Sequence, residues 1–310
     1  MSVTTAGRRE STAATYSLPW FSQQISHYAV HIVVIGLTVI WMIPTVGLLV
    51  SSFRPFSAIA STGWWTAISP PYNFTLQNYS DMLSQSNLGT AIFNSFMVAV
   101  PATIIPVTIA AFAAYAFSWM NFPGRNWIFL ALVGLLAVPL QLTFIPVTTF
   151  FVHAGWTTEN LEATGIPGLP WLPLWLAHAG YGMPFSIYLL SNFFRALPSD
   201  LFESAEIDGA GTLTTFFRLV LPLSVPALAS LVIFQFLWVW NDLLVALIYV
   251  GGAPEVAPLT VNLANLTNSL GQGYQLLTAA AFFSMIVPLV VFLSLQRYFV
   301  RGILAGSVKG

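Results

Sequence analysis

The chain has 310 residues, of which 57% are hydrophobic and only 6% are charged; its net charge is −1 and its mean hydropathy is +0.79. This composition excludes an ordinary soluble globular domain and predicts a membrane protein. The near-zero net charge gives no indication of nucleic-acid binding. The absence of cysteine excludes disulfides and thiol chemistry.

Charged residues divide the chain into long apolar intervals. A spanning helix needs about 20 mainly apolar residues to cross a hydrocarbon core about 30 Å thick. Six mainly apolar intervals contain no Asp, Glu, Lys or Arg and are long enough: 11–53, 82–124, 126–158, 163–194, 219–241 and 256–296. We therefore expect an all-α, polytopic membrane protein with six transmembrane helices, at 28–50, 91–118, 127–150, 171–194, 223–250 and 277–299.

The basic residues predict the orientation of these helices. Six spans place both termini and the loops at 119–126 and 195–222 on one side of the membrane. That side carries eight of the nine basic residues, and the other carries only Arg54. Because cytoplasmic loops are enriched in Lys and Arg, we expect a multi-pass protein of the inner (cytoplasmic) membrane with both termini in the cytoplasm. Residues 1–27 would form a cytoplasmic tail, 28–300 the membrane domain and 301–310 a second cytoplasmic tail.

The predicted spans contain several prolines, each of which removes a backbone donor and kinks or loosens its helix. They are Pro44, Pro101, Pro106, Pro139, Pro146, Pro184 and Pro288. Any one of them can be an ordinary membrane kink. Together they suit a protein whose helices rock between two arrangements.

A polar segment at 196–226 interrupts the apolar sequence and holds five of the nineteen charged residues. Asp200 is a candidate N-cap with Glu203 three residues later, which is the capping-box spacing. Gly209 can adopt the left-handed conformation that ends a helix, and Thr212 can cap a second helix running towards Pro222. We expect a short helix, a sharp bend and a second helix along the membrane surface. The alternative is a solvated amphipathic loop without a partner.

The same segment resembles a known signature. Glu203-Ser204-Ala205, three residues, Gly209, nine residues and then Leu219-Val220-Leu221-Pro222 is similar to the EAA motif of permease subunits of ABC importers. In that family the motif forms a coupling helix that docks into the ATP-hydrolysing subunit. The resemblance assigns docking to Glu203, Ser204, Ala205, Asp208 and Gly209, with Ser204 replacing the usual alanine.

Four further segments resemble the carbohydrate-uptake branch of these permeases, and more closely the MalG-type subunit of maltose transporters. They are NYSDML with the later Asn94-Ser95, YLLSNFFRALPSDLFESAEIDGAG, FLWVWNDLLVALI and QRYFVRGILAGSVKG. The resemblance implies the type I ABC importer permease fold. It also implies a second permease subunit in a heterodimer, two ATPase subunits, an extracytoplasmic solute-binding protein and a sugar substrate. The segment from Arg297 to Gly310 resembles one that reaches towards the ATPases; a basic end anchored at lipid headgroups is the alternative.

The chain lacks the glycine-rich phosphate-binding loop that ends in Lys-Ser/Thr, and its single lysine is Lys309. We therefore expect no cofactor in this subunit and no enzymatic activity of its own. ATP and Mg²⁺ would be bound and ATP hydrolysed by the partner ATPases.

A second polar cluster lies in the predicted fifth span. Gln235, Trp238, Asn241 and Asp242 fall at helical spacings, so they would share one broad face. An acid within a span usually faces the bundle interior or a water-filled cavity, and indoles beside amides and carboxylates suit a sugar. This predicts a translocation path. The alternative is interhelical hydrogen bonding, with Asp242 paired or protonated and Trp240 packed on a neighbour.

His178 lies among small residues that permit close helix approach, which predicts a hydrogen-bonded interior histidine. His31 and His153 are too isolated for a metal site, and no catalytic constellation is present. Besides an ABC importer permease for a sugar, the sequence leaves open an ion-coupled secondary transporter, for which Asp242 is the only clear carboxylate. An intramembrane enzyme is less favoured. The resemblance leaves open a monosaccharide, a disaccharide, a polyol or glycerol phosphate as the substrate. The absence of Arg and Lys from the span interiors favours a neutral sugar over a phosphate ester, unless the partner permease supplies the basic residue.

Overall fold

The computed structural model describes residues 20–85, 87–266 and 273–307, and within these ranges it contains helices and turns but no β-strand. The all-α prediction is confirmed. The α-helices are α1 (Trp20–Ser52), α2 (Phe56–Ser61), α3 (Gln77–Gln85), α4 (Leu88–Trp119), α5 (Arg125–Gly134), α6 (Phe144–His153), α7 (Thr158–Glu162), α8 (Leu172–Arg195), α9 (Ser199–Ile207), α10 (Thr212–Thr215), α11 (Leu221–Leu223), α12 (Val225–Trp240), α13 (Leu244–Tyr249), α14 (Leu259–Ala264), α15 (Tyr274–Ser284) and α16 (Ile286–Ser307). Short 3₁₀ segments are η1 (Trp64–Ile68), η2 (Leu135–Ala137), η3 (Leu140–Thr143) and η4 (Leu169–Trp171), and η5 (Phe216–Val220) is a π-helical turn.

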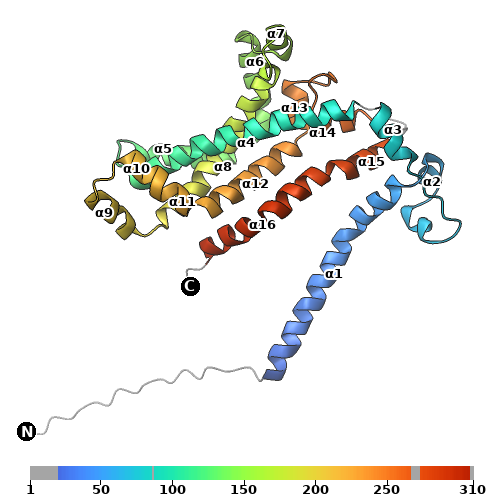
Figure 1. Cartoon of the computed structure of the whole chain (residues 1–310), viewed down its shortest axis with the longest axis horizontal. Helices are drawn as coiled ribbons and strands as arrows, with labels where there is room; N and C mark the ends of the chain where they lie inside the picture. Colours follow the sequence, from blue (N-terminus) through green and yellow to red (C-terminus); the bar gives the residue numbers. More distant parts are fainter. Residues whose placement is uncertain (1–19, 86, 267–272, 308–310) are drawn as a thin grey trace, which may run out of the picture.

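The centre of the molecule is a bundle in which α4 packs against α8 and α12, and α12 packs against α16 (Figure 1). Small residues let these helices approach closely: Ala102, Ala110 and Ala114 on α4 are completely buried. On α8, Gly182 lies so close to α12 that a Cβ atom there would be 2.6 Å from the amide of Gln235. The small residues on the facing sides of these helices therefore allow the helices to pack closely.

The predicted third span is broken rather than continuous. The helical segments Arg125–Ala137 and Leu140–Glu162 meet at an angle of 102°. Pro139 lies at the break, and Val138 before it is extended, with φ −80° and ψ 119°. A residue that precedes proline is driven out of the helical region by contact with the proline ring, so the sequence itself places this break.

By length and composition, three helical stretches in the described residues can each cross a membrane, at 28–52, 88–119 and 274–297; counting each of two bent pairs as one span raises the number to five. The predicted span at 171–194 corresponds to α8, whose 24 residues are long enough to cross. This helix carries polar residues such as His178, Ser186 and Ser191, which are buried inside the protein. The count of six spans stays a prediction.

Both ends of the predicted membrane domain differ from the expectation. The α1 helix already begins at Trp20, and α16 continues to Ser307, so part of each predicted tail is helical. The last span is interrupted at Met285, between α15 and α16. Residues 1–19 and 308–310 of the predicted tails lie outside the described residues.

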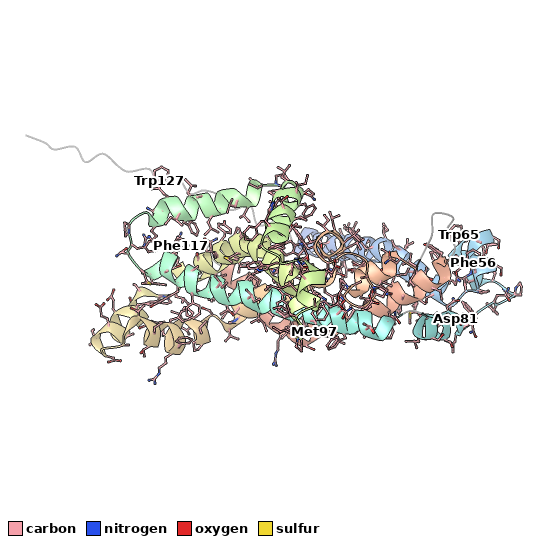
Figure 2. The ribbon with its side chains drawn as sticks, turned by 90° about the horizontal axis from the view of Figure 1, so that it is seen from above. Phe56, Trp65, Asp81, Met97, Phe117 and Trp127 are labelled. Atoms are coloured by element: carbon pink, nitrogen blue, oxygen red, sulfur yellow. The ribbon has the colours of Figure 1, made fainter. Side chains whose placement is uncertain are left out.

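The connections lie at two opposite ends of the bundle. In Figure 1, α5, α9 and α10 lie at one end and α2 and α3 at the other; Figure 2 labels Phe117 and Trp127 at the first end and Phe56 and Trp65 at the second. The α1 helix diverges from the bundle and contacts mainly α15 and η1 (Figure 1). The loops at 119–126 and 195–222, predicted to lie on the same side of the membrane, thus share one end of the molecule.

At the opposite end, Arg54 is buried and fastens the loop after α1. Its guanidinium donates to the carbonyls of Ala58 (3.0 Å) and Thr62 (3.2 Å) and to the Thr62 hydroxyl. The amide of Asn78 donates to the carbonyls of Ser52 and Arg54, each at 2.8 Å. Arg54, the one basic residue predicted on the extracytoplasmic side, therefore has a structural role within its own loop.

Candidate coupling loop and translocation cavity

The predicted short helix of the coupling loop is α9, which has no buried residue. It begins at Ser199 after Pro198, which occupies the N-cap position with φ −60° and ψ 131°. The prediction that Asp200 is the N-cap is therefore wrong: Asp200 lies within the first turn. Proline fixes φ near the value needed to start a helix and lacks the amide that would otherwise be unpaired. The Asp200 carboxylate still lies at the positive end of the helix dipole.

The end of α9 is set by Gly209, as predicted. Gly209 has φ +74°, in the left-handed region. Its amide donates to the Glu206 carbonyl (3.0 Å), and the amide of Ala210 donates to the Ala205 carbonyl (2.9 Å). This pair of bonds is the Schellman motif. A Cβ on residue 209 would meet no atom within 4 Å, so the backbone conformation, not crowding, favours glycine here.

The second arm of the loop begins at α10. Gly211 is its N-cap residue and Thr212 its first helical residue, so the prediction that Thr212 caps this helix is wrong. Glycine is one of the residues favoured at an N-cap, and Gly211, the residue before Thr212, occupies that position. The helical segment Thr212–Leu223 is inclined by 74° to the segment Val225–Trp240 that follows. This bend turns the arm away from the axis of α12.

The loop is fastened to the ends of two long helices. The indole of Trp119, the last residue of α4, stacks on the Phe202 ring of α9 with centroids 3.5 Å apart. The same indole donates through Nε1 to the Phe194 carbonyl of α8 (3.0 Å). The Tyr115 hydroxyl donates to the Thr212 carbonyl at 3.3 Å. Both arms of the loop are therefore attached to α4.

The outer face of the loop carries acidic groups beside exposed apolar ones. Glu203, Ser204 and Asp208 are exposed, and Ala205 is half-buried. Ile207 is 86% exposed and Leu213 is 65% exposed, one on each side of Gly209. The loop therefore presents a small exposed surface that combines apolar side chains with negative charge.

The predicted fifth span ends as a helix at Trp240. The amide of Asn241 and its side-chain Nδ2 both donate to the Leu237 carbonyl (3.2 Å and 2.7 Å), and a separate helix, α13, begins at Leu244. The prediction that Gln235, Trp238, Asn241 and Asp242 share one helical face is therefore wrong. Asparagine and aspartate side chains compete for backbone groups and so favour helix ends.

The four residues have different surroundings. Gln235 is 3% exposed and donates through Nε2 to the Ala102 carbonyl of α4 at 3.3 Å, which is the interhelical alternative. Trp238 is 41% exposed, and Asn241 is also exposed. Of the four, only Trp238 and Asn241 therefore present much surface for a solute. Whether any of them contacts a solute stays a prediction.

Asp242 lies at the start of α13. Its Oδ1 accepts from the Val245 amide (3.2 Å) and its Oδ2 from the Ala246 amide (2.9 Å). These bonds satisfy amides that a helix N-terminus leaves without intrahelical partners. Oδ2 also lies 3.6 Å from Nε2 of His178 on α8.

His178 is in the interior, as predicted, with an exposed fraction of 1%. The predicted hydrogen bond is not found within the described part of the chain, where neither ring nitrogen has a hydrogen-bond partner. Its ring meets Trp238 edge-on, with centroids 5.8 Å apart and planes at 85°. The described residues contain no group of three or more His, Asp or Glu that could hold a metal ion.

A cavity of about 520 Å³ opens where the broken third span meets α8 and α12. Its wall is mostly aliphatic, with Trp238 on one side and Thr143 and Tyr181 providing hydroxyls. The Tyr181 hydroxyl lies 2.7 Å from both the Thr143 and the Tyr249 hydroxyls. None of the described residues that line this cavity is charged.

These features are an all-helical apolar bundle, with helices long and apolar enough to cross a membrane, and an exposed acidic loop at one end. Residues 106–305 match the family described as binding-protein-dependent transport system inner membrane component. The match covers more than half of the chain, so the chain belongs to this family. The predicted membership is confirmed.

Two curated relatives cover nearly the whole chain. The osmoprotective compounds uptake permease protein GgtD of Synechocystis sp. is 54% identical over 90% of this chain and 91% of its own length. The alpha-glucoside transport system permease protein AglG of Rhizobium meliloti is 37% identical over 91% and 97%, respectively.

A solved structure of a bacterial ABC transporter for the acidic polysaccharide alginate has a chain of the same fold. Its TM-score is 0.72 at 19% identity, over 90% of this chain and 98% of that chain. The predicted ABC importer permease fold is confirmed.

Proposed function

We propose that this chain is a permease subunit of an ATP-driven importer that moves a neutral sugar or glycoside across the cytoplasmic membrane. One observation carries the proposal: the exposed loop of α9, Gly209 and α10 is fixed to the end of a long membrane helix. The relative from Rhizobium meliloti supports the substrate class, because its name refers to alpha-glucosides.

The coupling loop would dock into a partner ATPase. Glu203, Ser204, Ala205, Asp208 and Gly209 would form or shape the docked surface, with Ile207 as an apolar anchor. Closure of the ATPase pair would move α9, and the contacts of Trp119 with Phe202 and Phe194 would pass that movement to α4 and α8. The helices would then alternate between two arrangements whose populations the ligands bias. ATP and Mg²⁺ would bind to the partner ATPases.

The cavity beside Trp238 would form part of the translocation path. An exposed indole suits the apolar face of a sugar ring, and the hydroxyls of Thr143 and Tyr181 suit its outward hydroxyls. The uncharged lining supports a neutral solute over a phosphate ester. Asn241, exposed after the last turn of α12, would lie near one end of the path.

The remaining partners follow from the family and from surfaces left uncovered. An extracytoplasmic solute-binding protein would deliver the sugar to the end opposite the coupling loop, where α2 and α3 lie (Figure 1). The α1 helix exposes large apolar side chains such as Ile32, Ile40 and Trp41, which would contact lipid and a second permease subunit. Both termini would lie in the cytoplasm.

Reconstitution in proteoliposomes tests the function. The complete transporter, with its ATPases and solute-binding protein, should take up at least one of the radiolabelled alpha-glucosides maltose, sucrose, trehalose and methyl alpha-glucoside. Uptake should require ATP inside the vesicle and should stop when the ATPase subunits are omitted. Uptake that survives this omission but collapses with a protonophore would instead establish an ion-coupled transporter.

A further inference from the structure

Asp242 and His178 lie behind the wall of the large cavity rather than in it. Neither belongs to the residues that line the 520 Å³ cavity. With Ser95 of α4 they line a separate, much smaller cavity of about 10 Å³. Both side chains are largely inside the protein, with 1% exposure for His178 and 12% for Asp242. Their position excludes direct contact with a solute in the large cavity.

Asp242 is connected to the hydroxyl side of the large cavity through α13. Its carboxylate holds the first amides of α13, a helix of only six residues that ends at Tyr249. The Tyr249 hydroxyl bonds the Tyr181 hydroxyl, which in turn bonds the hydroxyl of Thr143. So short a helix is marginal without tertiary support. Loss of the Asp242 carboxylate would therefore let α13 shift, and Tyr249 with it, so that the hydrogen bonds among the three hydroxyls would no longer be held in place.

His178 is connected to the aromatic side of the same cavity. Its ring packs edge-on against the indole of Trp238, the aromatic ring that lines the cavity from α12. The imidazole is therefore the support behind Trp238. Truncation of His178 would leave a space into which the indole could turn.

The side chains of His178 and Asp242 are also close to each other. Nε2 of His178 is 3.6 Å from Oδ2 of Asp242, slightly too far for a direct hydrogen bond. The adjoining cavity of about 10 Å³ has room for about one water molecule, and a polar gap of this width is commonly bridged by one. The Ser95 hydroxyl accepts from the Leu259 amide at 2.7 Å and keeps its own hydrogen to donate. These three polar groups suit one bridging water.

We propose that Asp242 and His178 are positioning residues that act together: the pair fixes both walls of the translocation cavity, hydroxyl and aromatic, without touching the solute. This inference rests on the proposed function, since it assigns the cavity to the path. It changes the role predicted for Asp242, from a group that lines the path to one that orients the groups lining it.

The test compares uptake with ATP hydrolysis in the complete reconstituted transporter, using the probe that the wild type imports best. Asp242→Ala and His178→Ala should each lower the uptake rate about tenfold, equivalent to about 1.4 kcal/mol. ATPase stimulation by the loaded solute-binding protein should stay near the wild-type value, because the coupling loop is untouched. Asp242→Asn, which keeps an oxygen for the α13 amides, should retain most of the uptake.

The control is Ser230→Ala, on α12 and outside the pair, where the hydroxyl donates to the Pro226 carbonyl. It should leave both rates unchanged. Unchanged uptake in both alanine variants would overturn the proposal. A parallel loss of uptake and stimulated ATPase activity would also overturn it, because it would indicate general loss of structure. Should the alanine variants fail to assemble, His178→Gln replaces them under the same criteria, because it removes the ring that packs against Trp238.

A second readout separates this proposal from the proposed function. The chain has no cysteine, so Leu176→Cys places a single thiol in the cavity wall on α8. Its rate of reaction with a maleimide in the solubilised complex should change several-fold when Asp242→Ala or His178→Ala is added, and not with Ser230→Ala. If the wild type imports none of the probes, the proposed function fails, and an unaltered reaction rate would still overturn the positioning role.

Discussion

The indole of Trp119 and the ring of Phe202 lie nearly parallel, with centroids 3.5 Å apart and planes inclined by 18°. Trp119 ends the 32-residue helix α4, and Phe202 is the one residue of α9 that stacks on it. This stack is a direct contact between the candidate coupling helix and the membrane bundle. Movement of α9 therefore has a physical route into the helices that surround the cavity.

Removal of this stack should weaken coupling. Aromatic pairs contribute about 1 kcal/mol beyond the area they bury, so in Phe202→Ala the α9 helix should move without displacing α4 fully. We expect the number of solute molecules imported per ATP hydrolysed to fall several-fold in proteoliposomes. Leu201→Ala, beside it on α9, is the control and should change this ratio little. An unchanged ratio in Phe202→Ala would show that movement passes elsewhere.

Charge reversal on the outer face of α9 should detach the ATPase. Glu203 is exposed, so Glu203→Lys should insert and fold normally while placing the wrong charge on the docking surface. We expect less ATPase subunit to co-purify with the permease, and ATP-driven uptake to be lost. Glu162→Lys reverses an exposed acid on α7, remote from the coupling loop, and should retain the ATPase. Equal retention in the two variants would contradict docking through Glu203.

The conformation of Gly209 should matter more than its size. A side chain at φ +74° costs about 1 kcal/mol relative to glycine, so Gly209→Ala should distort the bend between α9 and α10. Gly209→Pro should be more severe, because proline cannot adopt positive φ. We expect both variants to insert but to hydrolyse ATP without matching uptake. Gly89→Ala, a helical glycine with no atom within 4 Å of its Cβ position, controls for the substitution itself; wild-type coupling in Gly209→Pro would contradict the prediction.

Close approach of α8 and α12 should be sensitive to one methyl group. A Cβ at Gly182 would lie 2.6 Å from the amide atoms of Gln235, so Gly182→Ala should destabilise the bundle by about 1–3 kcal/mol. Thermal unfolding of the solubilised chain measures this. Gly180→Ala, two residues away with no atom within 4 Å of its Cβ, is the matched control. Gln235→Ala should partly rescue Gly182→Ala by removing the crowded amide, and equal stability of the two glycine variants would refute the close contact.

The coupling loop was largely predictable because its signals are local. Gly209 ends α9 at the predicted position. The residue that ends this helix has a left-handed backbone conformation, which glycine adopts without strain. The errors at Asp200 and Thr212 are of one or two residues. In each case a neighbour without a capping side chain, Pro198 or Gly211, occupies the N-cap position instead.

The cavity and its supports could not be predicted in this way. The cavity is enclosed by mostly aliphatic residues from three separate predicted spans, and aliphatic residues in a membrane helix carry no positional signal. The sequence did single out Asp242, but helical spacing assumes that the helix continues. Here the Asn241 side chain donates to the Leu237 carbonyl and the Asp242 carboxylate accepts from the Val245 amide, and the α12 helix ends. That competition depends on packing around the break.

The most direct measurement of the central claim uses Ile207, which is 86% exposed at the tip of α9. Because the chain has no cysteine, Ile207→Cys introduces a single thiol whose maleimide labelling can be followed in inside-out membrane vesicles. Labelling should be rapid for the permease alone and strongly suppressed when the ATPase subunits are bound, while Trp65→Cys at the opposite end should not respond to them. Equal labelling of Ile207→Cys with and without bound ATPase would contradict the account.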